Sequence, residues 1–185
     1  MIKRLFDLVV SFLALIALMP VILILWVLIK LNSPGPALFV QERVGLNGRV
    51  FRILKLRTMK HQPKNAGDYR TVLNDPRITT IGKLLRKTSL DELPQLINVL
   101  KGDMSIVGPR PDTPMQEARY EPWQWEQRLS VRPGITGLAQ ATRRSLATHE
   151  ERLFLDLEYI RRQSFALDIW ICLKTVGMLG GKGSN

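Results

Sequence analysis

The stretch TSLDELPQLINVLKGDMSIVGPRP, from Thr88 to Pro111, carries the densest local signals in the chain. Within it, Ser89 is followed three residues later by Glu92, which is the form of a capping box at the start of a helix. Leucine and isoleucine then recur at helical spacing until Gly102, a residue type that favours a helix end. The pattern therefore predicts a short helix from Ser89 to Lys101, with its apolar stripe packed inward.

Two acidic residues, Asp91 and Glu92, would lie in the first turn of that helix. Free N–H groups and the helix dipole favour anions and metal-bound phosphates there, although acidic residues in a first turn often serve only as partners of the dipole. Next, the sequence predicts an apolar strand, Met104 to Val107, that leads into Gly108-Pro109-Arg110-Pro111. The prolines would stiffen the backbone around Arg110, and a fixed guanidinium suits bidentate phosphate binding; a merely rigid loop is the alternative.

The N-terminal segment has the length of a membrane helix. From Leu8 to Ile29 there is no charged residue, and about 22 residues in a helix reach roughly 33 Å. A cleavable signal peptide fits poorly because the apolar run is too long, and the buried core helix of a soluble protein is the other alternative. Basic residues flank both ends, Lys3 before the run and Lys30 after it, so both ends favour the cytoplasm. A bend at Pro20 would let the helix enter the membrane and return to the same face.

A hairpin is predicted directly after this segment. Ala37 to Val44 and Val50 to Arg57 have the composition of strands, and Asn47-Gly48 between them is a strong turn signal. Lys55 and Arg57 are two residues apart, so they are expected to share one face of the second strand. A solvated face is the simple interpretation of such a pair. Beyond the hairpin, residues 60–71 are polar and aperiodic and are expected to form a surface loop.

The second half of the chain contains three further helical patterns. Met115 to Leu129 is predicted to be helical, with a break at Glu121-Pro122. Glu150 to Arg162 has the charge pattern of an amphipathic helix, and Ser164 is placed to cap a last helix from Phe165 to Leu179. Three apolar residues of this last helix are expected to rest on a membrane surface: Trp170, Leu173 and Val176.

Composition limits the function classes. The chain has 185 residues with 45% hydrophobic and 23% charged residues, which allows one domain with a real core. A net charge of +11 calls for anionic partners such as nucleic acid, acidic lipid or phosphorylated substrates. The two histidines lie far apart, so a zinc cluster or a histidine triad is not expected. No recognisable nucleic-acid-binding module accompanies the charge, and nucleic-acid binding is therefore not expected.

Several ordered motifs resemble those of the bacterial sugar transferase family, the monotopic phosphoglycosyl transferases. The resemblance extends over nearly the whole chain and is highly specific. Besides the stretch from Thr88 to Pro111, the motifs that carry it are Ser33-Pro34-Gly35-Pro36, Gln41-Glu42-Arg43-Val44-Gly45, Lys55-Leu56-Arg57-Thr58-Met59, Asp75-Pro76-Arg77 and Arg132-Pro133-Gly134-Ile135-Thr136-Gly137.

The resemblance implies an α/β fold of two parts. Residues 1–32 would form a re-entrant membrane helix, and residues 33–185 a small, mainly helical catalytic domain with a short sheet or hairpin and interfacial amphipathic helices. The implied location is the bacterial inner membrane, in contact with membrane lipids and with the catalytic domain on the cytoplasmic face. The sequence does not fix the oligomeric state and allows a homodimer.

The implied reaction moves a sugar 1-phosphate from a UDP-sugar to undecaprenyl phosphate and releases UMP, at the start of bacterial polysaccharide or glycoprotein biosynthesis. Asp91 would attack the sugar-proximal phosphorus to form a covalent aspartyl phosphosugar. In an alternative, Asp91 only ligates Mg²⁺ and the lipid phosphate attacks directly. Glu92 would hold the metal or manage a proton, so Asp91 and Glu92 are the candidate Mg²⁺ ligands. The candidate phosphate and substrate ligands are Lys55, Arg57, Arg86, Arg110 and Arg132.

A second function class stays open at this stage. An apolar anchor joined to a strongly basic domain also suits a membrane-anchored protein that binds nucleic acid or lipid without catalysis. Release of UMP from a panel of UDP-sugars would separate the two classes, because a binding protein would release none.

Overall fold

The computed structural model describes residues 2–60, 75–143 and 147–179. In these residues the chain is mostly helical, with two small sheets of two strands each. The expected α/β character is therefore confirmed in its coarse form. In chain order the elements are α1 (Ile2–Asn32), β1 (Leu38–Val44), η1 (Leu46–Gly48), β2 (Val50–Leu56), α2 (Thr80–Thr88), η2 (Leu90–Glu92), α3 (Gln95–Lys101), β3 (Ser105–Val107), η3 (Pro114–Arg119), α4 (Pro122–Leu129), β4 (Gly134–Thr136), α5 (Leu138–Thr142), α6 (His149–Arg162) and α7 (Phe165–Leu179).

The predicted hairpin is confirmed. Strands β1 and β2 pair antiparallel, and the register runs from Leu38 opposite Leu56 to Val44 opposite Val50. Asn47 and Gly48 in the connection have φ angles of 54° and 78°, a left-handed backbone that asparagine and glycine adopt at low cost. The Asn-Gly signal in the sequence thus fixed the position of the turn.

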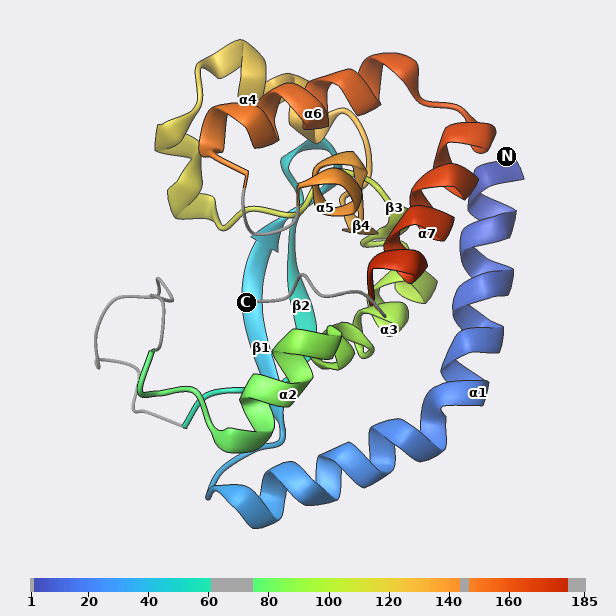
Figure 1. The fold of residues 1–185 in the computed structure, drawn as a ribbon. Helices are drawn as coiled ribbons and strands as arrows, with labels where there is room; N and C mark the ends of the chain where they lie inside the picture. Colours follow the sequence, from blue (N-terminus) through green and yellow to red (C-terminus); the bar gives the residue numbers. More distant parts are fainter. Residues whose placement is uncertain (1, 61–74, 144–146, 180–185) are drawn as a thin grey trace.

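The hairpin runs through the centre of the molecule, with α1 along one side, α2 near one end and α4 and α6 near the other (Figure 1). Its inner face packs against α3, because the buried Phe51 and Ile53 of β2 contact Val99 and Met104. Strands β3 and β4 form the second, parallel sheet next to α5 and α7. The predicted strand before the Gly-Pro-Arg-Pro sequence is therefore present as β3.

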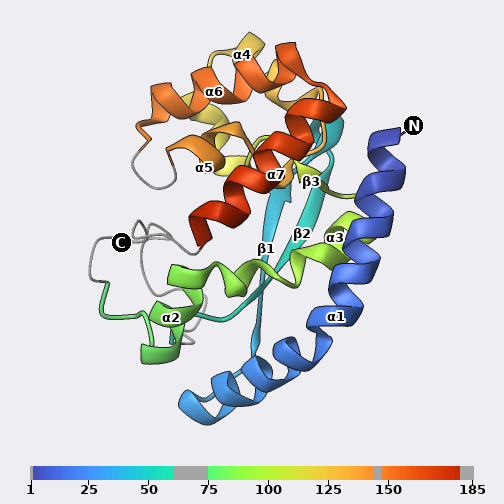
Figure 2. The same cartoon turned by 45° about the vertical axis from the view of Figure 1, so that its right-hand side comes forward.

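Helix α1 is exposed along most of its length. In the part of the chain that the structure describes, it is the one helix that is long and apolar enough to cross a membrane, and only 11% of its most apolar window is buried. A core helix of a soluble protein would be mostly buried, so this alternative does not fit α1. The helix changes direction near its middle (Figures 1 and 2). Pro20 lies in that region and removes a backbone hydrogen bond, which accounts for the bend.

Both ends of α1 contact the globular part. Near its start, the Lys3 Nζ donates to Asp168 Oδ2 at 2.7 Å and to the Val107 carbonyl at 3.1 Å. The buried carboxylate of Asp7 accepts a hydrogen bond from the backbone N–H of Ile106 at 3.1 Å. These contacts tie the first two turns of α1 to β3 and α7, which Figure 2 shows lying beside it.

At the other end of α1, Arg57 donates to the backbone carbonyls of Ser33 and Pro34 at 2.7 and 2.8 Å. Its guanidinium also reaches the Ile29 carbonyl at 3.3 Å. Lys55 and Arg57 have different partners, because Lys55 Nζ binds Glu92 whereas the Arg57 guanidinium binds the end of α1. That the two side chains share one face stays a prediction. The Arg57 side chain caps the C-terminal end of α1 and is buried there.

The predicted helix from Ser89 to Lys101 is wrong in its first half. Ser89 has a left-handed backbone with φ 57°, and its N–H donates to the Arg86 carbonyl at 3.3 Å, so it ends α2 and caps no following helix with its side chain. One 3₁₀ turn, η2, carries the two acidic residues, and α3 begins only at Gln95. The Ser-x-x-Glu spacing was misleading because the preceding helix ends immediately before it.

The helices predicted for the second half are confirmed. The break at Glu121-Pro122 separates η3 from α4, and α6 and α7 have the expected positions. The Ser164 Oγ accepts a hydrogen bond from the N–H of Leu167 at 3.2 Å, which is the predicted cap of α7. Trp170, Leu173 and Val176 are exposed as expected, and their contact with a membrane stays a prediction. Almost all of the polar loop predicted for residues 60–71 lies outside the described residues.

A close contact at Gly82 gives a first prediction. A Cβ at Gly82 would lie 1.9 Å from the Thr58 carbonyl oxygen, whereas a Cβ at Gly177 of α7 would meet nothing within 4 Å. Gly82→Ala should therefore force α2 away from the chain that follows β2 and cost about 1–3 kcal/mol, which lowers Tm by several degrees. Gly177→Ala, the control, should be neutral or stabilise by up to about 1 kcal/mol. Thermal unfolding in one detergent measures both, and equal Tm values for the two variants would contradict this packing.

Candidate active site

The centre of the candidate site is the carboxylate of Glu92, which holds two basic groups on one oxygen. Glu92 Oε1 accepts from Lys55 Nζ at 2.7 Å and from Arg110 Nη2 at 3.0 Å. Burial alone would raise the pKa of Glu92, but the two cations lower it to about 2. Glu92 is therefore ionised at any physiological pH, and it brings together β2, η2 and the loop after β3.

Asp91 is placed very differently from its neighbour. Its side chain is almost buried, yet no side chain in the described part of the sequence donates a hydrogen bond to its carboxylate. Burial raises the pKa of Asp91 above its ordinary value of 3.8, and the charge of Glu92 raises it further. Lys55, Arg110 and Arg86 oppose that rise through their positive charges. No cation in the described residues is therefore bound to the Asp91 carboxylate. A carboxylate in this state is available to act as a nucleophile or as a metal ligand.

Arg86 approaches the site from α2. Its Nε donates to the Thr58 Oγ1 at 2.9 Å, which fixes the guanidinium at the end of β2, and its charge acts on Asp91. Because Ser89 ends α2 in a left-handed turn, the chain folds back and places Asp91 near Arg86, five residues earlier. Lys55, Arg86 and Arg110, all predicted from the sequence, therefore do gather around the two carboxylates.

Arg110 lies in the 108–112 loop (Gly108, Pro109, Arg110, Pro111 and Asp112), and this loop is held from several sides. From β1, Arg43 donates to the Pro111 carbonyl at 2.9 Å, and the Val44 N–H donates to the Asp112 carbonyl at 2.9 Å. From the helices, Arg128 and Arg152 donate to the Arg110 carbonyl at 3.0 and 3.1 Å. The rigidity expected from the two prolines is thus reinforced by contacts from distant parts of the chain.

Two predicted ligands lie elsewhere. Arg57 is used at the end of α1, as described above. Arg132 is exposed, and its Nε donates to the Gly102 carbonyl at 3.0 Å, at the C-terminal end of α3 and away from the acidic pair at the other end. A role of Arg57 or Arg132 with substrate stays a prediction, but the structure does not bring either side chain to Glu92.

Asp91 and Glu92 are the residues that would hold a magnesium ion in this site. The residues 2–60, 75–143 and 147–179 assemble no group of three acidic, histidine or cysteine side chains that would form a complete metal cage. Mg²⁺ is commonly held by one or two carboxylates together with waters and substrate phosphates. Asp91 and the second oxygen of Glu92, Oε2, offer that donor set, because both protein cations are bound to Oε1.

The arrangement suits chemistry on a diphosphate. Three cationic side chains surround one free carboxylate, so an anionic substrate is attracted to the place where the carboxylate can attack it. Repulsion between the carboxylate and a phosphate is reduced by the same cations. A site of this kind favours phosphoryl transfer over proton transfer by histidine. His149, the histidine within the described residues, lies elsewhere, with its Nε2 3.3 Å from the Arg119 carbonyl oxygen.

Comparison with known proteins agrees with this chemistry. Residues 1–181 match the family model described as bacterial sugar transferase. The chain belongs to the bacterial sugar transferase family. This bacterial sugar transferase is 45% identical over 94% of its length to an undecaprenyl-phosphate glucose phosphotransferase of Komagataeibacter xylinus. It is 44% identical over 97% of its length to a UDP-glucose:undecaprenyl-phosphate glucose-1-phosphate transferase of Xanthomonas campestris pv. campestris. A third relative is the exopolysaccharide production protein PSS of Rhizobium leguminosarum bv. phaseoli, with 43% identity over 98% of the chain.

These relatives differ in length. The chain spans 35% of the Komagataeibacter protein and 39% of the Xanthomonas protein, but 97% of the Rhizobium protein. The chain therefore corresponds to one part of the two longer relatives and to nearly all of the Rhizobium protein.

Sequence reasoning missed three residues that hold the 108–112 loop of this sugar transferase: Arg43, Arg128 and Arg152. Arg43 stood in a quoted motif without an assigned role. Arg128 and Arg152 lie in helical patterns where a basic residue usually faces solvent. The sequence shows acidic and basic residues paired along α6. Such a pattern does not reveal that Arg152 binds the 108–112 loop, which lies outside that helix.

The charges around Asp91 predict a pH effect. If ionised Asp91 is required for the transfer reaction, kcat/KM falls as the pH drops through the pKa of Asp91. Lys55 lowers that pKa, so Lys55→Met should raise it and move the acid limb to higher pH. Lys101→Met, an exposed lysine at the far end of α3, is the control and should leave the limb in place. An unmoved limb in Lys55→Met would show that another group titrates.

Proposed function

We propose that this bacterial sugar transferase moves a sugar 1-phosphate from a UDP-sugar to undecaprenyl phosphate and releases UMP. The observation that carries the proposal is the contrast within the acidic pair: Glu92 binds two cations, while Asp91 beside it binds none among the described residues. The names of the Komagataeibacter and Xanthomonas relatives supply the substrate class, and UDP-glucose is accordingly the first donor to test. The product would begin the synthesis of a bacterial glycoconjugate, as the name of the Rhizobium relative suggests.

In the first step an oxygen of Asp91 attacks the sugar-proximal phosphorus of the donor. A new bond forms between that phosphorus and Asp91, the bond to the bridging oxygen breaks, and UMP leaves with the electron pair. In the second step an oxygen of the lipid phosphate attacks the same phosphorus and Asp91 leaves as a free carboxylate. The raised pKa of Asp91 reflects a poorly solvated carboxylate, which is a stronger nucleophile than a hydrated one.

The basic residues have distinct parts in this scheme. Arg110 and Arg86 approach Asp91 from opposite elements, a loop and α2, and would clamp the diphosphate from two sides. Lys55 and Arg110 are kept in place by Glu92 before the donor arrives. Mg²⁺, held by Asp91 and Glu92 with the substrate phosphates, would supply further neutralisation of the diphosphate charge.

The position of α1 supports a re-entrant membrane helix. Lys3 and Asp7 fix its first turns to the globular part, and Arg57 fixes its last turn to the same part. A globular part that holds both ends lies on one side of a membrane, so the bend near Pro20 would place the middle of α1 in the lipid. With basic residues at both ends, this side would be the cytoplasmic face of the inner membrane.

Single cysteines test the topology. Ile2 and Leu31 are 71% and 80% exposed, so Ile2→Cys and Leu31→Cys in a Cys172→Ser background should disturb few contacts. Both should be protected from an impermeant thiol reagent in intact cells and labelled after lysis. Labelling of position 2 in intact cells would show that α1 spans the membrane.

The nucleophile is tested by Asp91→Asn and by mass spectrometry. The amide keeps the shape of the side chain but cannot attack phosphorus, so UMP release should fall by about 10⁴-fold or more while Tm stays close to that of the wild type. Wild-type protein given UDP-glucose and Mg²⁺ without lipid should gain the mass of a hexose phosphate on Asp91.

The control is Asp103→Asn, at an acidic residue just after α3, which should retain activity. Rapid UMP release that requires the lipid phosphate, with no adduct at any time, would instead favour direct attack by the lipid phosphate. Release of UDP, or no turnover with any UDP-sugar, would contradict the proposed reaction as a whole.

A further inference from the structure

A group of mostly buried charged and polar side chains joins the 108–112 loop to α4 and α6. We call it the Asp112 network; it consists of Asp112, Tyr120, Arg128, Arg152 and Asp156. The carboxylate of Asp112 pairs with Arg128 and with Arg152, the latter at 2.9 Å, and accepts from the Tyr120 hydroxyl at 2.7 Å. Asp156 pairs with Arg128 at 2.8 Å. Side chains of Asp112, Arg128 and Asp156 are all at most 3% exposed.

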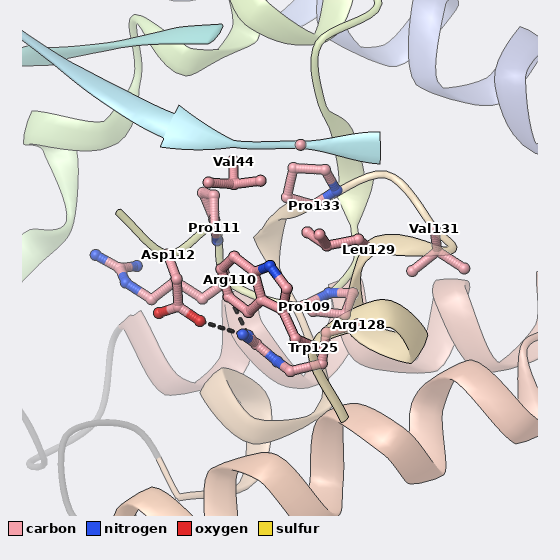
Figure 3. A pocket seen from close by; sticks show the side chains of 11 residues that line it. Val44, Pro109, Arg110, Pro111, Asp112, Trp125, Arg128, Leu129, Val131 and Pro133 are labelled. Atoms are coloured by element: carbon pink, nitrogen blue, oxygen red, sulfur yellow. Dashed lines mark hydrogen bonds and ion pairs between the residues drawn. The ribbon is translucent and has the colours of Figure 1, made fainter. Parts of the chain in front are cut away.

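Both arginines of the Asp112 network converge on one backbone atom. The carbonyl oxygen of Arg110 accepts from Arg128 Nη2 at 3.0 Å and from Arg152 Nη2 at 3.1 Å. Figure 3 shows Arg128 between the Asp112 carboxylate and the backbone of the loop, with dashed lines to both. The residue whose backbone is held in this way is the one whose side chain binds Glu92.

The loop has little room to move. It is backed by Trp125 and Leu129 of α4 and by Pro133, and the cavity between them has a volume of about 10 Å³, space for about one water molecule (Figure 3). Apolar packing on this side and two charged donors on one carbonyl fix the backbone in position and orientation. The Arg110 guanidinium is less constrained, because its side chain is 39% exposed.

We propose that Arg128 and Arg152 are positioning residues that act through Arg110. Their donors hold the Arg110 carbonyl so that the guanidinium on the same residue meets the donor diphosphate at the right place. Asp112 and Asp156 neutralise and orient the two arginines. This inference rests on the proposed function, because it assigns Arg110 to the diphosphate of the donor.

The chemistry of the network favours this role over stabilisation alone. Buried ion pairs contribute little net stability compared with apolar side chains of similar volume, because desolvation opposes the attraction. What such a network supplies is a fixed geometry, since each guanidinium has donors in one plane and their acceptors lie in set directions. Here the fixed donors bind the carbonyl of Arg110, a residue of the candidate active site.

A double-mutant cycle tests the proposal. Arg152 is the better residue to change, because its side chain is 25% exposed, whereas loss of Arg128 would leave two buried carboxylates without their main partner. The four proteins are wild type, Arg152→Met, Arg110→Lys and the double variant, each as the full chain. The matched control is Arg162→Met, which removes an exposed arginine of the same helix whose partner is Glu158.

If Arg152 acts through Arg110, Arg152→Met should lower kcat/KM for UMP release from UDP-glucose by about tenfold to a hundredfold. In the Arg110→Lys background the same change should cost about twofold or less, because the side chain that needed positioning is already lost. Arg162→Met should have no effect in either background. The cycle is then repeated with Asp91→Asn added to each of the four proteins. These variants should not turn over, so the Kd for UDP-glucose is measured in place of kcat/KM.

An equal loss in both backgrounds would overturn the positioning role and leave the proposed function intact. Coupling in Kd together with no UMP release from the wild type would keep the positioning role and refute the proposed reaction. Absence of UDP-glucose binding to any of the proteins would refute both.

Thermal unfolding shows whether each variant is folded. Arg152→Met should keep a cooperative transition like that of Arg162→Met. Should it fail to fold, Arg152→Lys replaces it: the amine keeps a positive charge beside Asp112, but it cannot reach Asp112 and the Arg110 carbonyl with the planar geometry of a guanidinium. The same cycle with Arg152→Lys must then show a loss that depends on Arg110, or the proposal is wrong.

Discussion

One carboxylate oxygen, Glu92 Oε1, accepts from a lysine of β2 and from an arginine of the loop after β3. Two cations so close repel each other, so they stay together only because the partly buried negative charge of Glu92 lies between them. This contact draws a hairpin, a 3₁₀ turn and a loop to a common point. It also neutralises the negative charge of Glu92. Asp91 is then the one carboxylate of the pair to which no cation is bound.

The same balance of charge is repeated further out. Lys3 in α1 contacts Asp168 in α7, and the Asp112 network joins α4, α6 and the loop. In a protein with a net charge of +11, the buried aspartates of these networks, Asp7, Asp112, Asp156 and Asp168, are each bonded to a basic group or a backbone donor, whereas Asp91 is not. The excess positive charge is therefore free for anionic substrates and for acidic lipid.

The elements with local signals could be predicted from the sequence, and the long-range contacts could not. Asn47-Gly48 located the hairpin and Ser164 the start of α7, because both depend on neighbouring backbone. The Ser89 pattern failed because Ser89 ends α2, so it does not cap a helix that follows. Family motifs pointed to Lys55, Arg86 and Arg110, but the partners of Arg128 lie 16 and 28 residues away, at distances that no spacing rule covers.

The contact between Lys3 and Asp168 can form only late in synthesis of the described chain, after α1 itself has been made. The two residues are 165 positions apart, and a ribosome that adds 5–20 residues per second needs on the order of ten to thirty seconds to cover that distance. Throughout this time α1 is already synthesised but lacks the partner of its first lysine. With α1 in a membrane as proposed, the lipid and the bend of the helix must maintain its orientation first, and the salt bridge can secure it only after Asp168 has been synthesised.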